Sequence, residues 1–235
     1  MLHASRSQEV QPTGPSASAA LCPAEFFPAL DALEFVRTAF IQRCPGIDVV
    51  TDRKTALTRL WLAHRRTADA LGFSGMPFVL AEQVHGSGVV RVDAPSRVPA
   101  PAADGLITSC SQLCLAIYVA DCAAVYLADK KTRSIGLIHA GKKGAQLGVV
   151  KKAVAAMQEQ FGTDPRDLVM QISPCIRPPH YEVDFAADIV RQGREAEVGA
   201  IFDCDNCTAC HPELYYSYRR EKGSTGRLLA LAAIT

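Results

Sequence analysis

The sequence predicts an α+β fold, a single domain in which mixed β-sheets form a central layered core flanked by helices. Short apolar runs rich in Val, Ile, Leu and Tyr follow one another in groups, and amphipathic segments stand between the groups rather than after every strand. The chain has 235 residues, which is enough to bury a sizeable core, and it shows no internal repeat and no linker after residue 26.

The expected helices are separated by the strand-rich middle of the chain. They span residues 51–72, 144–161 and 184–196, and a last helix is expected to begin near Thr225. Thr51 or Asp52 can cap the first helix, and Gly72 can end it. An apolar stripe at helical spacing, closed by Gly162, supports the second.

The expected strands are short apolar runs bounded by turn residues. They span residues 77–84, 88–93, 105–108, 114–120, 123–128, 134–139, 168–173 and 214–218. Residues 1–23 are rich in Ser, Ala, Pro and Gln without any period, so we expect a disordered extension there and one catalytic domain over residues 24–235.

Composition excludes several functional classes. The formal net charge is +1, which gives no indication of a nucleic-acid or anionic-membrane partner. No apolar run approaches the roughly 20 residues that a membrane helix needs, and the N-terminus does not read as a secretory signal. Nine cysteines at irregular spacing then predict reduced thiols in a cytoplasmic protein rather than a disulfide framework.

Three residues of metal-ligand type stand where strands meet turns. His85 closes an apolar run, Cys122 lies between two strands, and His139 ends the strand in "IGLIHAGKKG" (135–144). Two imidazoles and a thiolate form a set that zinc accepts in tetrahedral geometry, with the fourth position open for catalysis. Taken singly, each residue could equally be an ordinary strand end or a small core residue.

Two polar residues next to these ligands suit a supporting role. Gln83 precedes His85 by two positions, and Asp121 directly precedes Cys122. Either could hold an imidazole tautomer or a bound water molecule. We therefore expect Gln83 to contact substrate, and Cys122, His139 and Asp121 to be the catalytic residues.

Six short motifs occur in one order along the chain. They are "QVHG" (83–86), "ADG" (103–105), "DC" (121–122), "HAG" (139–141), "YEVD" (181–184) and "YSYRREKGSTGR" (216–227). Together they resemble the laccase-domain family, also called the multifunctional purine nucleoside phosphorylase family and, in bacteria, the peptidoglycan-editing factor family. The resemblance spans nearly the whole folded chain and implies that His85, Cys122 and His139 bind one zinc ion.

The resemblance implies an activity as well. Family members split purine nucleosides with phosphate and deaminate adenosine, and their reported substrates are adenosine, inosine, guanosine and methylthioadenosine. Two motifs depart from the family pattern: Lys142 replaces the usual Trp after H-A-G, and "SPCI" (173–176) replaces G-P-x-I. The missing aromatic ring at position 142 bears on substrate preference more than on metal binding.

Phosphate needs cationic partners, and three candidates stand out. Lys143 keeps the basic position after "HAG", Arg43 follows "AFIQ" where the family carries an arginine, and Arg177 lies beside a strand end. Arginine binds phosphate oxygens bidentately, whereas lysine acts as a point charge. His180 lies near the Pro-Pro turn, and histidine is the residue type that most often carries protons near neutral pH. Each could also be an ordinary surface or loop residue.

A second group of ligand-type residues lies in "DCDNCTACH" (203–211). Cys204, Cys207, Cys210 and His211 have a spacing that metal sites use, although a cluster needs a fourth cysteine at suitable distance. Buried or reactive thiols are the alternative interpretation.

Three other functions remain open at this point. A copper-dependent phenol oxidase is disfavoured, because six histidines without any H-x-H pair cannot assemble a three-copper cluster, although copper can occupy a Cys/His₂ site in vitro. A metal-free cysteine hydrolase would use Cys122 as nucleophile and His139 as base. A hydrolase that edits cell-wall precursors would use the same pocket.

Overall fold

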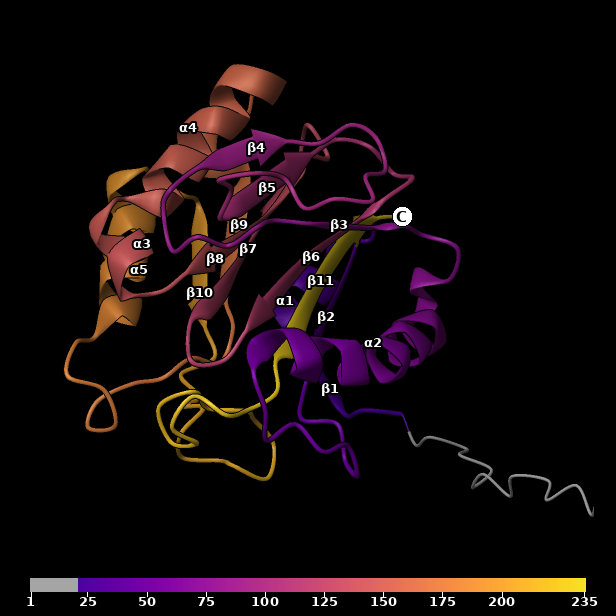
Figure 1. Ribbon diagram of the computed structural model, residues 1–235. Coiled ribbons are helices and arrows are strands. Elements are labelled where there is room, and N and C mark those ends of the chain that lie inside the picture. The colour runs from indigo at the N-terminus through magenta and orange to yellow at the C-terminus, as the bar shows by residue number, and fades with distance from the viewer. Residues whose placement is uncertain (1–20) are drawn as a thin grey trace, which may run out of the picture.

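The computed structural model describes residues 21–235, so the predicted extension over residues 1–23 lies almost wholly outside the described residues. Two stacked β-sheets form the centre of the molecule (Figure 1). The α+β prediction is confirmed. Among the helices of residues 21–235, none combines the length and apolarity that a bilayer crossing requires.

The first sheet has five strands in the order β1-β2-β11-β6-β3. Their bounds are Ala24–Glu25 (β1), Val36–Ile41 (β2), Leu228–Ile234 (β11), Cys114–Val119 (β6) and Phe78–Leu80 (β3). β3 pairs with β6 in parallel, and the other neighbours are antiparallel. The C-terminal strand therefore lies at the centre of this sheet.

The second sheet has six strands in the order β10-β9-β7-β8-β5-β4. Their bounds are Ala200–Asp203 (β10), Leu168–Ile172 (β9), Ala123–Asp129 (β7), Ile135–Ala140 (β8), Gly105–Thr108 (β5) and Val89–Arg91 (β4). The two outer pairs are parallel and the inner ones are antiparallel. β7 and β8 form a buried hairpin in the middle of the sheet.

Helices cover the outer faces of both sheets. α3 (Lys142–Gln146), α4 (Val149–Phe161) and α5 (Phe185–Glu195) gather on one side of the six-stranded sheet, where their apolar residues form one core (Figure 1). The larger core fills the space between the sheets and extends to α2 (Arg53–Ala68), which lies on the side of the five-stranded sheet. A short helix, α1 (Pro28–Asp31), contacts β2 and β9.

Side-chain capping and glycine residues with positive φ determine where these helices begin and end. The Asp52 side chain accepts a hydrogen bond from the Thr55 backbone N–H at 3.1 Å, which caps α2 as predicted. The helix expected over residues 144–161 begins earlier and is divided into α3 and α4, because Gly148 has a left-handed φ of 73°. A π-helical turn over Asp69–Phe73 continues α2.

Two predictions near the C-terminus are wrong. Residues 214–218 form an irregular segment with turns at its ends rather than a strand, and the helix expected from Thr225 is the central strand β11. Every residue of β11 is buried between β2 and β6, so tertiary pairing overrides the helical preference of its alanines and leucines. The strands β1, β2 and β10 and the helix α1 were not predicted.

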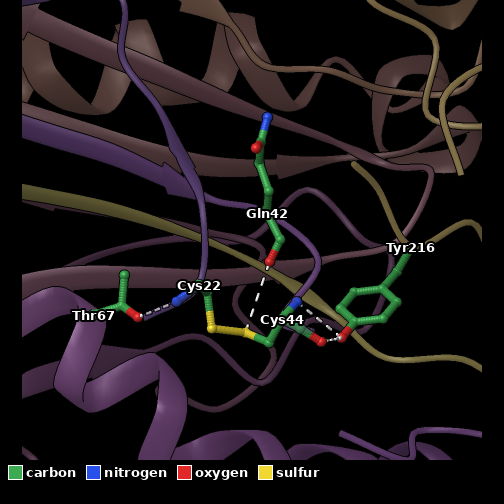
Figure 2. The surroundings of a disulfide bond; sticks show 5 residues. All are labelled: Cys22, Gln42, Cys44, Thr67 and Tyr216. Atoms are coloured by element: carbon green, nitrogen blue, oxygen red, sulfur yellow. Dashed lines mark hydrogen bonds between the residues drawn. A yellow bond between two sulfur atoms is a disulfide. The ribbon is translucent and has the colours of Figure 1, made fainter. Parts of the chain in front are cut away.

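A disulfide between Cys22 and Cys44 joins the N-terminal segment to the chain just after β2 (Figure 2). The Cys22 backbone N–H also donates to Thr67 of α2 at 2.9 Å, and the Cys44 backbone N–H donates to the Tyr216 hydroxyl at 3.2 Å. The prediction of reduced thiols is therefore wrong for this pair, whereas the other seven cysteines are free.

Candidate metal centre

The β7–β8 hairpin brings two of the three candidate ligands together. Ala124 pairs with His139, and Ala123 pairs with Ala140, so Cys122, directly before β7, lies beside the end of β8. His139 is buried and Cys122 is partly buried. Strand register thus places a thiol and an imidazole side by side although they are far apart in sequence.

The third candidate ligand comes from the loop after β3. His85 is exposed and has a left-handed φ of 57°, an uncommon conformation for a residue with a side chain. The Asp104 carboxylate holds this loop: it accepts hydrogen bonds from the backbone N–H of His85 at 3.0 Å and from that of Gly86 at 2.7 Å. The His85 and His139 rings meet edge to face with centroids 4.9 Å apart.

His85, Cys122 and His139 each offer a donor atom, and these atoms all lie within 4.8 Å of one another. Within residues 21–235, this is the one group of three or more such side chains that comes together. Two nitrogen donors and one sulfur donor suit a single cation of borderline softness, and three protein donors leave a further position open. The chemistry of this donor set fits a metal site.

Asp104 is the polar residue behind this cluster, and it was not among the site residues predicted from the sequence. Its Oδ1 atom lies 2.8 Å from Nδ1 of His139, and its backbone carbonyl accepts from the His139 N–H at 2.6 Å. Because Nδ1 is engaged, the Nε2 atom of His139 is left to face Cys122. The "ADG" motif was the sequence signal that pointed to this residue.

The pKa values of Cys122 and His139 shift in opposite directions, which favours a negative thiolate beside a positive imidazolium. Burial opposes ionisation of Cys122, but hydrogen bonds from His139 and His85 outweigh it and lower the thiol pKa to about 6. Burial likewise opposes a charged His139, but its hydrogen bonds to Asp104 and Cys122 raise its pKa to about 9. The cluster therefore favours a thiolate, which is the form that binds metals.

Close approach explains the glycine in "HAG". A Cβ atom at Gly141 would lie 2.6 Å from the Cys122 sulfur and 3.9 Å from a carbon of the His85 ring. Any side chain at this position would displace the thiol, so glycine is required for the cluster to form.

The cluster lines a cavity of about 800 Å³. Five cationic side chains line the same cavity, namely Arg53, Lys142, Lys143, Arg219 and Arg227. Asp121 is the one acidic side chain of the lining, and both of its carboxylate oxygens already accept hydrogen bonds. The cavity is therefore electropositive and suits an anionic ligand.

Gln83 and Asp121 both line the cavity, but their polar groups are engaged elsewhere. Gln83 donates to the Tyr118 carbonyl at 2.6 Å and accepts from the Tyr118 N–H at 3.1 Å. Asp121 accepts from the Thr208 hydroxyl and from the Arg219 N–H, each at 2.7 Å. Both residues hold neighbouring segments together around the cavity through these hydrogen bonds. We expected one of them to contact an imidazole, but Asp104 makes that contact.

The three cations expected to bind phosphate are not brought together. Lys143 lines the cavity, but Arg43 and Arg177 do not. Arg43 pairs with Glu221 at 2.8 Å and stacks on the Tyr216 ring, whereas Arg177 pairs with Asp203 and, at 3.3 Å, with Asp205. These two expectations do not fit the structure, since both guanidinium groups already have acidic partners.

Two further candidates lie outside the cavity. His180 is exposed and does not contribute to the lining, so the structure gives no support to a role as proton carrier. Cys204, Cys207, Cys210 and His211 do not form a metal-donor group within the described part of the chain. Burial raises the pKa of Cys204 to about 12, so this thiol stays protonated.

Fold and site together define a class: α+β proteins of one domain with a His–Cys–His donor cluster in an electropositive cavity. The chain belongs to the family described as multi-copper polyphenol oxidoreductase laccase, whose profile matches residues 48–198 and 184–235. This agrees with the resemblance found in the sequence.

Curated relatives carry a more specific description. Purine nucleoside phosphorylase YlmD of Geobacillus stearothermophilus is 28% identical over 225 residues, which cover 79% of this chain and 81% of that protein. Purine nucleoside phosphorylase Rv2149c of Mycobacterium tuberculosis is 33% identical over 192 residues, which cover 71% and 76%, respectively.

Solved structures share the fold. The crystal structure of YlmD from Geobacillus stearothermophilus superimposes with a TM-score of 0.73 at 23% identity and covers 88% of this chain and 94% of that one. A Bacillus licheniformis hypothetical protein, YfiH, gives a TM-score of 0.75 at 22% identity and covers 85% and 93%.

Proposed function

We propose that this protein is a zinc-dependent purine nucleoside phosphorylase that acts on adenosine, inosine, guanosine and methylthioadenosine, and that it also deaminates adenosine. The observation that carries the proposal is the His–Cys–His cluster inside an electropositive cavity large enough for a nucleoside. The names of the curated relatives support the same reaction.

His85, Cys122 and His139 would hold the zinc ion, with Asp104 fixing the tautomer and orientation of His139. The donor set fits zinc in particular, since imidazole and thiolate are its common protein ligands. When bound, zinc supplies Lewis-acid chemistry, which polarises a ligand oxygen and makes water more acidic. Copper can compete for the same donors in vitro.

Phosphorolysis requires an anion and a nucleoside to be held together. One phosphate oxygen forms a bond to C1′ of the sugar while the bond from C1′ to the purine nitrogen breaks. The electron pair of that bond leaves with the base, which takes up a proton, and the products are a free purine and ribose 1-phosphate. The cavity's cations, Lys143 among them, would hold the phosphate and offset its charge as it approaches the sugar.

Lys142 and Arg219 shape the rim of the cavity. Glu182 pairs with Lys142 at 3.5 Å and with Arg219 at 3.1 Å, and the Arg219 guanidinium lies 4.8 Å from the centre of the Tyr181 ring. Lys142 stands where the family usually has Trp, but the lining keeps other aromatic side chains that could pack against a base, among them Tyr181 and Phe185, whose ring centres lie 5.9 Å apart.

A matched set of reactions tests the proposal. Inosine and adenosine are incubated with the purified protein, with and without phosphate and with and without a metal chelator, and the products are separated. The proposal predicts ribose 1-phosphate only when phosphate is present, loss of product with chelator, and inosine from adenosine. Cleavage at an equal rate without phosphate would identify a hydrolase instead.

A second candidate function, a metal-free cysteine hydrolase, is favoured by one observation. The lowered pKa of Cys122 and the raised pKa of His139 describe a thiolate–imidazolium pair, which is how cysteine nucleophiles are activated. The two functions differ in their inhibitors. For the hydrolase, alkylation of Cys122 abolishes activity and a chelator has no effect, whereas the zinc enzyme loses activity with the chelator.

A further inference from the structure

Arg227 is a buried cation without an acidic partner. Its exposed fraction is 8%, and it lines the cavity close to the C-terminal strand. Its Nη1 atom donates to the backbone carbonyls of Thr225 at 3.0 Å and Gly226 at 2.8 Å, which holds the guanidinium in place. No carboxylate of residues 21–235 forms an ion pair with it.

Arg53 is a second cavity cation without an ion-pair partner among residues 21–235. It is the first residue of α2, and its side chain is exposed. The neighbouring Asp52 carboxylate is occupied by the backbone N–H and the hydroxyl of Thr55. Burial and the charge of Arg53 lower the pKa of Arg227, and the opposing charges of Cys122 and Asp121 offset this only in part, so the two guanidinium groups are close enough to repel one another.

Two guanidinium groups that line one cavity and form no ion pair within residues 21–235 repel one another, and an anionic ligand would relieve this repulsion. The other arginines considered above, Arg43, Arg177 and Arg219, each pair with a carboxylate. Arg53 and Arg227 therefore stand out as the pair whose bidentate donors are left for a ligand. A phosphate group accepts several such hydrogen bonds and carries up to two negative charges, which matches this pair.

We propose that Arg53 and Arg227 form a phosphate-binding subsite of the cavity, next to Tyr118 and Tyr218. The ligand chemistry is a phosphate group, which has two possible sources. It is either inorganic phosphate, in which case the subsite serves the proposed function and rests on it, or the 5′-phosphoryl group of a purine nucleotide. The subsite replaces Arg43 and Arg177 as the location of bound phosphate.

Calorimetric titration of the full chain with inorganic phosphate, inosine and inosine 5′-monophosphate tests the subsite. The variants are Arg53→Met, which alters an exposed side chain, and Arg227→Lys, which keeps the charge but removes bidentate donors. Lys54→Met is the matched control, since it removes a charge from the same turn of α2 outside the cavity. We expect Kd for a phosphate-bearing ligand to rise about tenfold or more in Arg53→Met and Arg227→Lys and to stay unchanged in Lys54→Met.

Comparison of the three ligands shows whether the bound phosphate is inorganic phosphate or the 5′-phosphate of a nucleotide. A rise in Kd for inorganic phosphate, with a matching rise in its KM in phosphorolysis, assigns the subsite to the co-substrate. If the variants bind inosine 5′-monophosphate no more tightly than inosine, and their Kd for inorganic phosphate is unchanged, the subsite binds the 5′-phosphate of a nucleotide. Wild-type affinity of Arg53→Met for both phosphate-bearing ligands overturns the subsite, as does a wild-type protein that binds neither. A protein that binds phosphate through Arg53 and leaves every nucleoside uncleaved retains the subsite and refutes the phosphorylase.

Discussion

Asp104 and His139 are joined twice, through a side-chain contact of 2.8 Å between Oδ1 and Nδ1 and a backbone hydrogen bond of 2.6 Å. The same carboxylate anchors the loop that carries His85. One buried aspartate therefore orients one proposed ligand and positions another.

Asp104→Asn should weaken metal binding about 10- to 100-fold, because the amide cannot replace a carboxylate that accepts three hydrogen bonds. Metal affinity is measured by competition with a chromogenic chelator. Asp129→Asn is the matched control, since Asp129 is equally buried but its carboxylate accepts from Lys131 and Thr132 rather than from the proposed ligands. Equal metal affinity in Asp104→Asn and wild type would show that Asp104 has no part in binding.

Gly141→Ala should reduce metal affinity about tenfold or more, because its Cβ atom would meet the Cys122 sulfur at 2.6 Å. The structure must shift to make room for this Cβ atom, and the shift should lower the free energy of unfolding by about 1–3 kcal/mol. Denaturant titration measures this change. Gly136→Ala, in β8 and away from the cluster, is the control for overpacking. A Gly141→Ala protein with full metal affinity contradicts the proposed closeness of the donors.

His64 should make the protein sensitive to mild acid. It is fully buried, neither ring nitrogen has a hydrogen-bond partner among residues 21–235, and burial lowers its pKa to about 4 from an ordinary 6.5. The neutral ring is favoured in the folded state, so its contribution is complete above pH 6.5 and is lost as the pH falls toward 4. The loss amounts to about 3 kcal/mol at most.

His64→Leu should therefore flatten the pH dependence of the free energy of unfolding between pH 6.5 and 4, measured by denaturant titration at each pH. Exposed His180→Leu serves as the control and should leave the slope unchanged. Identical slopes for wild type and His64→Leu would contradict the account, because they would mean that His64 takes up its proton at the same pH in the folded and unfolded chains.

The sequence was most informative where a local pattern coincides with tertiary structure. The strands that carry Cys122 and His139 are continuous apolar runs, and both residues fall at strand ends, so their position could be predicted from the chain alone. β11 could not, because "LLALAAI" is apolar at every position and has neither a helical nor a strand period. Only its neighbours β2 and β6 decide its conformation.

The supporting residues depend on long-range contacts that the sequence does not encode locally. Asp121 and Asp104 both precede small or thiol residues, yet only Asp104 contacts an imidazole. Arg43 and Arg53 are ten positions apart and look alike as sequence. Glu221, 178 residues after Arg43, neutralises one of them, and the other faces the cavity.

Metal content tests the central claim most directly. Protein purified without added copper should contain about one zinc ion per chain by mass spectrometry, and Cys122→Ala should contain almost none, because two imidazoles alone hold zinc poorly. Cys204→Ala, which changes a free thiol outside the cavity, should keep the full amount. A full complement of zinc in Cys122→Ala would contradict the assignment of His85, Cys122 and His139 as one metal site.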